Sequence, residues 1–552
     1  MPVRKLTKTT PIDENASVVN YLQLLLKPSF WGKDVKKVNL IQTHTSWVFL
    51  TGKYAYKIKK PVFFGFLDYT SLSAREHFCK EEFRINQLLA PDIYYQVMPI
   101  VKIGNKIALA TKKNKYPVID YAIKMRELPQ DAIMTSRLKH KMVNYSTIDE
   151  IARIIAHFHN QSIAKPDFLK FGSLEIIKYN WDENFAQTEP FVNITINKKT
   201  FNEIKSQVEK FMEINAPIFE KRIADAKIKQ CHGDLHSHNI FIVDAHSTNL
   251  SRKKLGPEKV YIFDCLEFNP RFAISDVASE IAFFVMDLEF YQHKHLADFF
   301  IARYLNYTND WEMLRVLDFY KCYRAYVRGK VTSFNLNDRG ISKSQKMHAA
   351  LEAKKYFALA DKYAQNLFVS PKLIMIMGLP GVGKTYLAQH LSNEILAFHL
   401  SSDIIRKEIT NTPIEKHCFE GYGKGIYAPE VSKKTYEELY RRAENYLSQK
   451  KSVIVDATFL WEKSRQELKA IAEKYAAQFY IIHCQCPEKV VLSRMQKRKN
   501  EFSFSDATPE IYYKLKNNVD EVKDKRNYLA VDTSKPIRTN LQRIIKYLSK
   551  QS

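Results

Sequence analysis

Cysteine is scarce in this sequence, and long apolar runs are missing from it. The 552 residues include 7 cysteines with no regular spacing, a pattern that argues against a disulfide framework and favours a reducing compartment. No apolar stretch approaches the length of about 18 residues that indicates a membrane-spanning helix. Residues 1–8 lack the apolar core of a signal peptide. We therefore expect a cytoplasmic protein with no membrane partner, and no obligate protein partner is evident.

Acidic residues are outnumbered by basic ones. Lys and Arg total 85 against 60 for Asp and Glu, which gives a formal net charge of +25 and a pI near 9.4. Such an excess attracts nucleotides, nucleic acid or an anionic membrane surface, although lysine-rich solvated faces produce the same composition. The length exceeds what one hydrophobic core usually holds, so we expect two or three domains.

The sharpest motif lies at residues 378–385, which read Gly-Leu-Pro-Gly-Val-Gly-Lys-Thr and match the phosphate-binding pattern G-x-x-x-x-G-K-[ST]. An apolar run at 373–377 precedes it, as a buried parallel strand requires, and helical spacing follows at 386–391. The N–H groups of such a loop favour an anion. The alternative is a glycine-rich turn that only joins strand to helix. The residues predicted to bind ATP here are Gly378, Leu379, Pro380, Gly381, Val382, Gly383, Lys384 and Thr385.

Lys384 and Thr385 have separate predicted roles within this loop. Lys384 is expected to reach the β- and γ-phosphates and to act in catalysis, and Thr385 to offer its hydroxyl to Mg²⁺. Asp456 ends a later apolar strand, as a metal-binding aspartate does, and is predicted to hold Mg²⁺ directly or through water. The alternative for Asp456 is a carboxylate that caps the following turn.

Strands and helices alternate after residue 372, which is typical of a parallel sheet. Besides 373–377, the sequence predicts strands at 397–400, 452–456, 479–483 and 528–532. Five strands around a phosphate-binding loop predict an α/β P-loop domain over 371–552. A helical run over 342–370 is predicted to link it to a first domain over 1–341.

Two pairs of charged residues are candidates for catalysis in the P-loop domain. Asp403 and Arg406 are three residues apart and share one helix face. Asp403 is predicted to take a proton from an acceptor hydroxyl, and Arg406 to bind an anionic part of the acceptor. Arg494 and Arg498, one helical turn apart, are predicted to close over the transferring phosphate. The alternatives are a helix cap with an ordinary arginine, and a solvated basic face.

The first domain begins with strand-like segments. Residues 46–50 and 54–58 are rich in aromatic and β-branched residues and predict a hairpin that places Lys57 on a strand. A long helical pattern follows over 73–89 and carries Glu81 and Glu82. A strand lysine paired with a helix glutamate holds ATP phosphates in protein-kinase-like folds. Glu82 is the predicted partner, with Glu81 as the second choice.

A second set of residues in the first domain has the spacing of a catalytic loop. His232-Gly-Asp234 is followed by Asn239, and an apolar strand then ends at Asp264. Phosphoryl transfer by such a loop requires a carboxylate beside the acceptor hydroxyl and two oxygen ligands for Mg²⁺. The spacing Asp-x4-Asn matches the H-x-D-x4-N pattern.

These residues resemble the aminoglycoside phosphotransferase-like kinases. The likeness extends to residues 56–62, 65–69 and 78–91, and it is similar to one uncharacterised branch named bifunctional aminoglycoside phosphotransferase/ATP-binding protein, which also carries a C-terminal P-loop domain. The resemblance implies an α+β protein-kinase-like fold in which Asp234 is the base. It also implies that Asn239 and Asp264 are Mg²⁺ ligands and that Lys57 and Glu82 hold the phosphates. The sequence departs from the pattern in one respect, because no glycine-rich loop precedes Lys57.

The second domain resembles the small P-loop kinases of the polynucleotide-kinase, zeta-toxin and gluconate-kinase group. The likeness rests on the loop 378–385, Asp403 with Arg406, Arg494 with Arg498, and residues 505–509 and 530–534. In the polynucleotide-kinase branch, the Asp-x-x-Arg pair implies a 5′-hydroxyl acceptor; in other branches the acceptor is a sugar or an antibiotic.

The sequence as a whole predicts a two-domain phosphotransferase that moves the γ-phosphoryl group of ATP, with Mg²⁺, to a hydroxyl. The acceptor would be a small molecule or a nucleic-acid end. Two alternatives remain open. In the first, only the P-loop domain is an enzyme and the first domain is a sensor; in the second, the chain is a nucleic-acid-binding ATPase.

Overall fold

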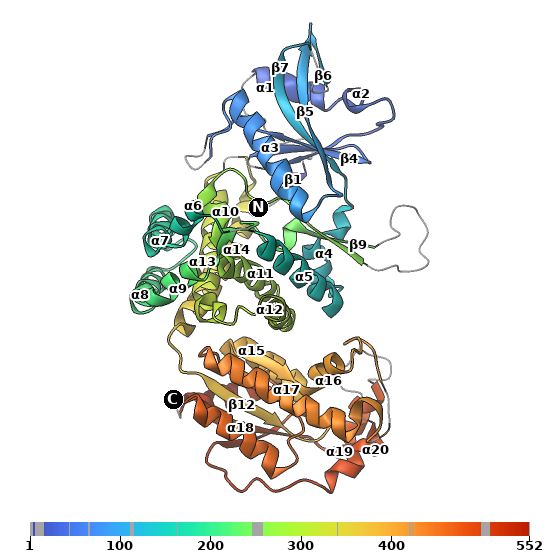
Figure 1. The fold of residues 1–552 in the computed structure, drawn as a ribbon, viewed down its shortest axis with the longest axis vertical. Helices are drawn as coiled ribbons and strands as arrows, with labels where there is room; N and C mark the ends of the chain where they lie inside the picture. Colours follow the sequence, from blue (N-terminus) through green and yellow to red (C-terminus); the bar gives the residue numbers. More distant parts are fainter. Residues whose placement is uncertain are drawn as a thin grey trace. The chain divides into compact units, whose positions relative to one another are not determined.

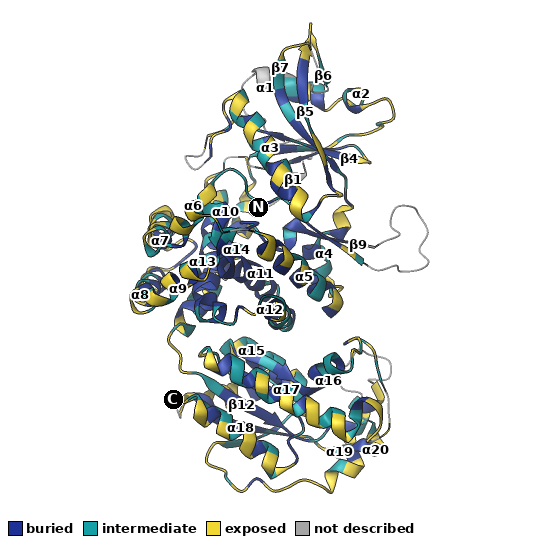
Figure 2. Ribbon diagram, in the orientation of Figure 1, coloured by how far each residue is buried: buried dark blue, intermediate teal, exposed yellow. Residues whose placement is uncertain are grey.

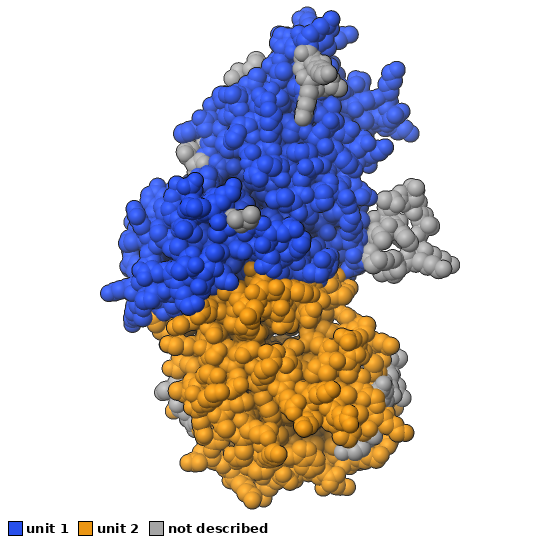
Figure 3. Space-filling view, viewed as in Figure 1, with its two compact units in different colours: residues 1–143, 150–291, 319–364 blue, residues 144–149, 292–318, 365–552 orange. Residues whose placement is uncertain are grey.

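The chain divides into two compact units (Figure 3). Unit 1 comprises residues 1–143, 150–291 and 319–364, and unit 2 comprises residues 144–149, 292–318 and 365–552. This computed structural model describes residues 4–5, 16–43, 45–63, 67–110, 115–162, 164–244, 258–338, 340–418, 421, 423–497 and 508–550.

The division differs from the boundaries expected at 341 and 370. Residues 292–318 belong with the P-loop half, and the helix α14 (Lys343–Asn366) belongs to unit 1 up to residue 364 instead of forming a separate linker. Its inward face explains this, because Ala353, Tyr356 and Phe357 are almost fully buried.

Unit 1 contains a seven-stranded sheet in the order β1-β2-β3-β4-β7-β5-β6, in which all neighbours are antiparallel. The predicted hairpin is present as β3 and β4. The strands are β1 (Arg4–Lys5), β2 (Asn39–Gln42), β3 (Ser46–Leu50), β4 (Tyr54–Lys59), β5 (Tyr94–Ile103), β6 (Lys106–Leu109) and β7 (Val118–Arg126).

Helix α3 (Leu72–Leu89) lies along this sheet (Figure 1). Ser71 caps its first turn by accepting from the Ala74 N–H, and its buried residues include Cys79, Glu82 and Ile85. These recur at three-residue spacing, so one face of the helix turns toward the strands. The predicted helix over 73–89 is thereby placed with Glu82 on its inner face.

Helices form most of the rest of unit 1. The most enclosed is α11, in which every residue from Val277 to Glu289 is buried, including the acidic Glu280, Asp287 and Glu289 (Figure 2). The helices are α1 (Ala16–Leu25), α2 (Pro28–Trp31), α4 (Met134–Lys139), α5 (Tyr145–Gln161), α6 (Pro166–Leu169), α7 (Leu174–Thr188), α8 (Lys198–Ile214), α9 (Ala216–Ala224), α10 (Pro270–Ala273), α11 (Val277–Phe290) and α13 (Met313–Phe334). The first residues of α5 and α13 are assigned to unit 2.

Two short antiparallel ladders frame the predicted catalytic loop of unit 1. One pairs β8 (Ile228–Gln230) with β11 (Ile274–Asp276), and the other pairs β9 (Ile240–Asp244) with β10 (Glu258–Ile262). The loop from 231 to 239 therefore leaves one ladder and enters the next, and Asp264 follows the end of β10.

Unit 2 contains a five-stranded parallel sheet in the order β13-β14-β12-β15-β16. This confirms the predicted parallel sheet. The central β12 is buried from Leu373 to Met377, as a strand covered on both faces must be. The strands are β12 (Lys372–Met377), β13 (Phe398–Ser401), β14 (Val453–Asp456), β15 (Gln478–Gln485) and β16 (Tyr528–Asp532).

Helices follow the strands of unit 2 in alternation. They are α12 (Lys294–Thr308), α15 (Lys384–Ile395), α16 (Ser402–Ile409), α17 (Pro429–Ser448), α18 (Glu462–Lys474), α19 (Glu488–Lys497), α20 (Pro509–Lys516) and α21 (Ile537–Ser549). Of these, α12 precedes the first strand of the sheet by more than sixty residues in sequence. Among the described helices, none combines the length and the apolar character needed to cross a membrane.

Candidate active sites in the two units

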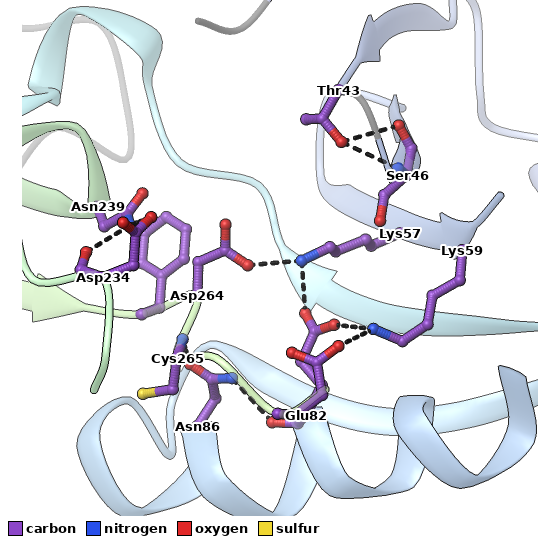
Figure 4. Close-up of polar contacts among 12 residues, drawn as sticks. Thr43, Ser46, Lys57, Lys59, Glu82, Asn86, Asp234, Asn239, Asp264 and Cys265 are labelled. Atoms are coloured by element: carbon purple, nitrogen blue, oxygen red, sulfur yellow. Dashed lines mark hydrogen bonds and ion pairs between the residues drawn. The ribbon is translucent and has the colours of Figure 1, made fainter. Parts of the chain in front are cut away.

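Lys57 is the centre of the polar cluster in unit 1 (Figure 4). From β4, its Nζ donates to Glu82 Oε1 of α3 at 2.8 Å and to Asp264 Oδ1 at 2.5 Å. Burial alone would lower the pKa of Lys57, but the Asp264 and Glu82 carboxylates raise it well above its ordinary value. Glu81, the second choice, pairs instead with Arg84 on the surface. The lysine is thus held charged between the helix and the strand-end aspartate.

A second lysine on the same strand completes this network, and sequence reasoning missed it. Lys59 is 1% exposed and donates to Glu82 Oε2 at 2.7 Å and to Tyr69 Oη at 3.2 Å. It also pairs with Glu267, which accepts from Tyr69 Oη at 2.5 Å. Because Glu267 follows Asp264 by three residues, this contact ties the segment after β10 to β4, and Lys59 in turn links it to Glu82 of α3. The alternation of a strand gives Lys57 and Lys59 the same face, which is the signal that could have found it.

Asp234 and Asn239 come together in the loop between β8 and β9. Asn239 Nδ2 donates to the Asp234 carbonyl at 2.9 Å and to its Oδ2 at 3.1 Å, and His236 Nε2 lies 3.2 Å from the same Oδ2. Burial alone would raise the pKa of Asp234, but the bond from His236 and the nearby charge of Arg328 lower it well below its ordinary value. The carboxylate is therefore ionised, and its side chain is 29% exposed.

Asp264 lies between the Asp234–Asn239 pair and Lys57 in Figure 4. Its φ of +71° is a left-handed conformation, uncommon outside glycine. The neighbouring Cys265 N–H donates to Asn86 Oδ1 of α3 at 3.0 Å, and His232 Nε2 lies 3.0 Å from the Phe263 carbonyl. Burial would raise the pKa of Asp264, but Lys57 lowers it. The structure thus brings together Lys57, Glu82, Asp234, Asn239 and Asp264.

Buried side chains of α11 and α13 hold the backbone of this loop. The Gly233 N–H donates to Glu280 Oε2 at 2.8 Å, and the Ser237 N–H donates to Asp287 Oδ2 at 2.8 Å. Arg324 Nη1 donates to the Gly233 carbonyl at 3.1 Å. Gly233 has φ +82°, and a Cβ there would lie 2.8 Å from the Phe272 carbonyl. The loop that presents Asp234 is therefore fixed at three backbone groups.

The phosphate-binding loop of unit 2 needs its glycines for conformation and for space. Gly378 has φ +142°, and a Cβ there would lie 2.5 Å from the Cys484 carbonyl; Gly381 has φ +83° and would meet Val491 at 2.7 Å. Gly383, with φ +92°, offers no side-chain cap to α15, so the first N–H groups of that helix are available to an anion. Lys384 Nζ donates to the Leu379 carbonyl at 3.1 Å across the loop.

Thr385 and Asp456 meet at the start of α15. Thr385 Oγ1 donates to Asp456 Oδ1 at 3.3 Å, and the Asp456 side chain is 2% exposed. The other carboxylate oxygen, Oδ2, lies 2.7 Å from His399 Nε2 of β13. His399 was not singled out from the sequence, because its contact with Asp456 follows only from β13 lying beside β14.

Arg406 points inward, and its contacts differ from the acceptor-binding role predicted for it. Its Nη1 donates to the Ile426 carbonyl at 3.0 Å and to Ser432 Oγ at 3.0 Å, its guanidinium lies over the Tyr427 ring, and the residue is 7% exposed. It therefore fastens the segment 426–432 in this structure. Asp403 lies half-buried in the first turn of α16.

Arg494 bridges the phosphate-binding loop and the turn after β16. Its Nη1 donates to the Val382 carbonyl at 3.1 Å and its Nη2 to the Thr533 carbonyl at 2.7 Å. The side chain thus joins two backbone segments next to Gly383. A Cβ added to Gly383 would lie 3.2 Å from Arg494 Nη1. Arg498, its predicted companion, lies outside the described residues.

A cavity of about 240 Å³ opens beside the first residues of the loop. Its walls include Gly378, Leu379, Thr458, Leu460, His483 and Tyr512. Among the residues that the structure describes, its lining contains no acidic or basic side chain apart from His483. Burial and the charge of Arg465 lower the pKa of His483, so the imidazole is neutral near pH 7. Arg465 also donates to the Phe459, Leu460, Asp520 and Glu521 carbonyls, which makes one wall rigid.

The oxygen atoms in both units suit Mg²⁺, which prefers carboxylate, carbonyl and hydroxyl ligands. In unit 2, Thr385 and Asp456 would hold the ion, and the buried Ser401 hydroxyl opposite Asp456 has no hydrogen-bond partner within the described part of the chain. In unit 1, Asn239 and Asp264 would hold it, with the Asp264 side chain 45% exposed. All seven cysteines are free, and five of them are buried.

Comparison with known proteins bears on the C-terminal half. Residues 373–521 match a family described as an AAA domain, and this region contains the phosphate-binding loop and most of the parallel sheet of unit 2. Uncharacterized proteins of Mycobacterium tuberculosis (strain ATCC 25618 / H37Rv) and Mycobacterium bovis (strain ATCC BAA-935 / AF2122/97) are each 27% identical over 478 residues, covering 86% of this chain and 88% of theirs. The resemblance noted for the first domain stays a prediction.

Solved structures were matched as well. A gluconokinase from Sinorhizobium meliloti 1021 is 18% identical, with 33% of this chain and 98% of that chain covered and a TM-score of 0.24. The Mycobacterium tuberculosis APS kinase CysC in complex with AMPPNP and APS is 15% identical, with the same coverage and a TM-score of 0.24.

Proposed function

We propose that this protein is an ATP-dependent phosphotransferase with two ATP sites, one in each unit. Each site would move the γ-phosphoryl group to a hydroxyl of a small molecule. The observation that carries the proposal is that the same three kinds of group occur in both units: a lysine, an aspartate at or just after the end of a strand, and a second side-chain oxygen that could share a metal ion with that aspartate. They are Lys57, Asp264 and Asn239 in unit 1, and Lys384, Asp456 and Thr385 in unit 2.

In unit 1 the acceptor hydroxyl loses its proton to Asp234 as its oxygen bonds to the γ-phosphorus. The bond from that phosphorus to the bridging oxygen breaks, and ADP leaves. Bound Mg²⁺ would supply charge neutralisation for the phosphates. The low pKa of Asp234 keeps it able to accept a proton, and Asn239 fixes its orientation. Lys57, held by Glu82, would position the phosphate tail.

In unit 2 the loop N–H groups and Lys384 would hold the phosphates, and Asp403 would take the proton of the acceptor. The inward contacts of Arg406 do not support an acceptor-binding role for that residue in this conformation. The uncharged cavity beside Gly378 and Leu379 favours a small molecule as acceptor over a nucleic-acid end, because phosphates require positive partners.

A second candidate function for unit 1 is a nucleotide sensor. The turn between β2 and β3, where a glycine-rich cover is missing, is closed by a side chain: Ser46 N–H donates to Thr43 Oγ1 at 2.9 Å (Figure 4). A phosphate cover of this kind offers fewer free N–H groups than a glycine loop.

The test uses the full chain and three variants: Lys384→Ala, the isosteric Asp234→Asn, and the two combined. ADP release is measured against sugars, nucleosides, aminoglycosides and 5′-hydroxyl oligonucleotides. We expect each single variant to lose the activity of one unit by about 10²-fold or more, and the double variant to lose both. Undiminished turnover in Lys384→Ala would remove the P-loop site from the proposal.

The sensor and the kinase alternatives for unit 1 are distinguished in the Lys384→Ala chain, in which only unit 1 is expected to bind nucleotide. Binding of Mg·ATP with no turnover for any acceptor, unchanged by Asp234→Asn, favours the sensor. Turnover that disappears with Asp234→Asn favours the kinase.

A further inference from the structure

Both carboxylate oxygens of Asp456 are occupied by side chains of unit 2. Thr385 Oγ1 donates to Oδ1 at 3.3 Å, and His399 Nε2 lies 2.7 Å from Oδ2. The His399 side chain is 5% exposed, so water does not compete for this bond. Two contacts on opposite oxygens fix the rotation of a carboxyl group about its last bond, which one contact does not.

The surrounding face of the sheet is polar where a parallel sheet is normally apolar. Ser401 lies directly opposite Asp456 in the parallel register of β13 and β14, and His399 lies two residues before it on the same face. The Ser401 hydroxyl is buried and has no hydrogen-bond partner among the described residues. Three polar side chains therefore line the strand ends next to Thr385, and one of them has an unused hydrogen-bonding group.

The strand that carries His399 is held at its free edge by α12. β13 is the outermost strand of the sheet and pairs with β14. On the side of β14, the Phe398 N–H donates to the Ser452 carbonyl at 2.9 Å. On the other side, Lys294 Nζ donates to the Ala397 carbonyl at 2.8 Å, and the His399 N–H faces Asp298 Oδ2 at 3.4 Å.

Lys294 and Asp298 thus occupy the positions that a neighbouring strand would fill. They are paired to each other at 2.6 Å across one turn of α12, and both are buried. An edge strand presents N–H and C=O groups that no neighbouring strand pairs, and covering that edge with a helix is one way in which proteins satisfy them. The helix therefore sets where residue 399 lies, and through its imidazole where the Asp456 carboxylate points.

From these contacts we propose that His399 is a positioning residue that orients Asp456 as a metal ligand, and that α12 holds it in place through Lys294 and Asp298. This inference rests on the proposed metal role of Asp456 in the P-loop site. Groups that orient metal ligands in this way typically change metal affinity or activity about 10- to 100-fold when removed.

The experiment measures binding of a fluorescent ATP analogue to the full chain as a function of Mg²⁺ concentration, and in EDTA. All chains carry Asp264→Ala, so that unit 1 contributes no signal that depends on its own metal site. We expect His399→Leu to raise the Mg²⁺ concentration needed for half-maximal binding about tenfold or more. Binding in EDTA should stay within about twofold, because the loop itself is unchanged.

Rescue separates orientation from shape. His399→Gln places an amide nitrogen near the position of Nε2, so most of the Mg²⁺ dependence should return. A leucine variant with the Mg²⁺ dependence of the parent chain overturns the inference, as does a glutamine variant no better than leucine. If the parent chain does not bind the nucleotide with Mg²⁺, or binds it no better than the Lys384→Ala chain does, the proposed function is overturned as well.

The part played by α12 is tested by removing its buried pair together, as Lys294→Met with Asp298→Leu, so that neither charge is left alone in the interior. Arg303→Gln is the matched control, since Arg303 lies on the same helix but pairs with Asp149. We expect the double variant to raise the Mg²⁺ requirement severalfold and the control to leave it unchanged. Equal behaviour of the two chains contradicts the role of α12.

Discussion

Lys57 and Glu82 form an ion pair of 2.8 Å between β4 and α3, and the glutamate side chain is fully enclosed. The other oxygen of Glu82 is held by Lys59 at 2.7 Å. One carboxylate thus bridges two lysines, each of which has a second acidic partner, Asp264 for Lys57 and Glu267 for Lys59.

Replacing Glu82 should therefore cost more than replacing its sequence neighbour. We expect Glu82→Ala to lower the free energy of unfolding by about 3 to 5 kcal/mol, because it breaks two buried ion pairs at once and leaves Lys57 with Asp264 alone and Lys59 with Glu267 alone. Glu81→Ala removes only a surface pair with Arg84 and should cost less than about 1 kcal/mol. Urea unfolding of both variants checks this, and equal losses would contradict the assignment.

Gly381 should not tolerate a side chain, although another glycine with the same backbone conformation should. We expect Gly381→Ala to destabilise unit 2 and weaken nucleotide binding, since its Cβ would lie 2.7 Å from Val491. Gly423 has φ +74° and open space around it, so Gly423→Ala carries only the left-handed strain of about 1 to 2 kcal/mol. Thermal unfolding of both variants measures how much more stability Gly381→Ala loses than Gly423→Ala, and this difference is the cost of the steric clash. Equal losses in the two variants would contradict a clash at Gly381.

Arg494 should not be replaceable by lysine. Its two nitrogens reach the Val382 and Thr533 carbonyls at once, and a lysine ammonium cannot span both. We expect Arg494→Lys to weaken nucleotide binding about tenfold, as loss of about 1.4 kcal/mol implies. Arg526→Lys is the control, because Arg526 pairs with Asp524 on the surface. Nucleotide titration by fluorescence is the measurement, and unchanged affinity in Arg494→Lys argues against the bridge.

Lys330 should make the stability of unit 1 depend on pH. Its Nζ contacts the Asn184 and Gln187 side-chain oxygens at 2.6 Å each, and burial lowers its pKa from 10.5 to about 8. The unfolded chain then binds more protons between these values, so stability rises with pH across that window.

We expect the difference in unfolding free energy between the parent chain and Lys330→Met to grow in favour of the parent by about 3 kcal/mol from pH 8 to pH 10.5. The exposed Lys354→Met should show no such growth. Urea unfolding at several pH values measures the difference, and a flat profile would count against the lowered pKa.

Periodicity and spacing predicted much of the fold. The five strands of unit 2 are apolar runs bounded by turns, and each observed strand overlaps its prediction. The hairpin β3–β4 and the face of α3 that carries Glu82 also follow from local pattern. The grouping of Asp234, Asn239 and Asp264 follows from the spacing of a loop and the strand end after it.

Contacts between distant segments were not predictable in the same way. The three-residue spacing of Asp403 and Arg406 fixes a helix face but not what the guanidinium meets, and it meets residues 426–432. His399 acquires its partner only through the order of the strands. Strand alternation places Lys59 on the same face as Lys57, but it does not show that both lysines reach Glu82.

Because unit 2 is assembled from residues 144–149, 292–318 and 365–552, no single break in the chain separates the two units. A gene exchange with one crossover point near residue 341 would deliver the P-loop sheet without the helix that closes its outer strand. Proteins descended from this one are therefore expected to inherit both halves together. An attempt to express the P-loop half alone should include α12 with the sheet whose outer strand it contacts.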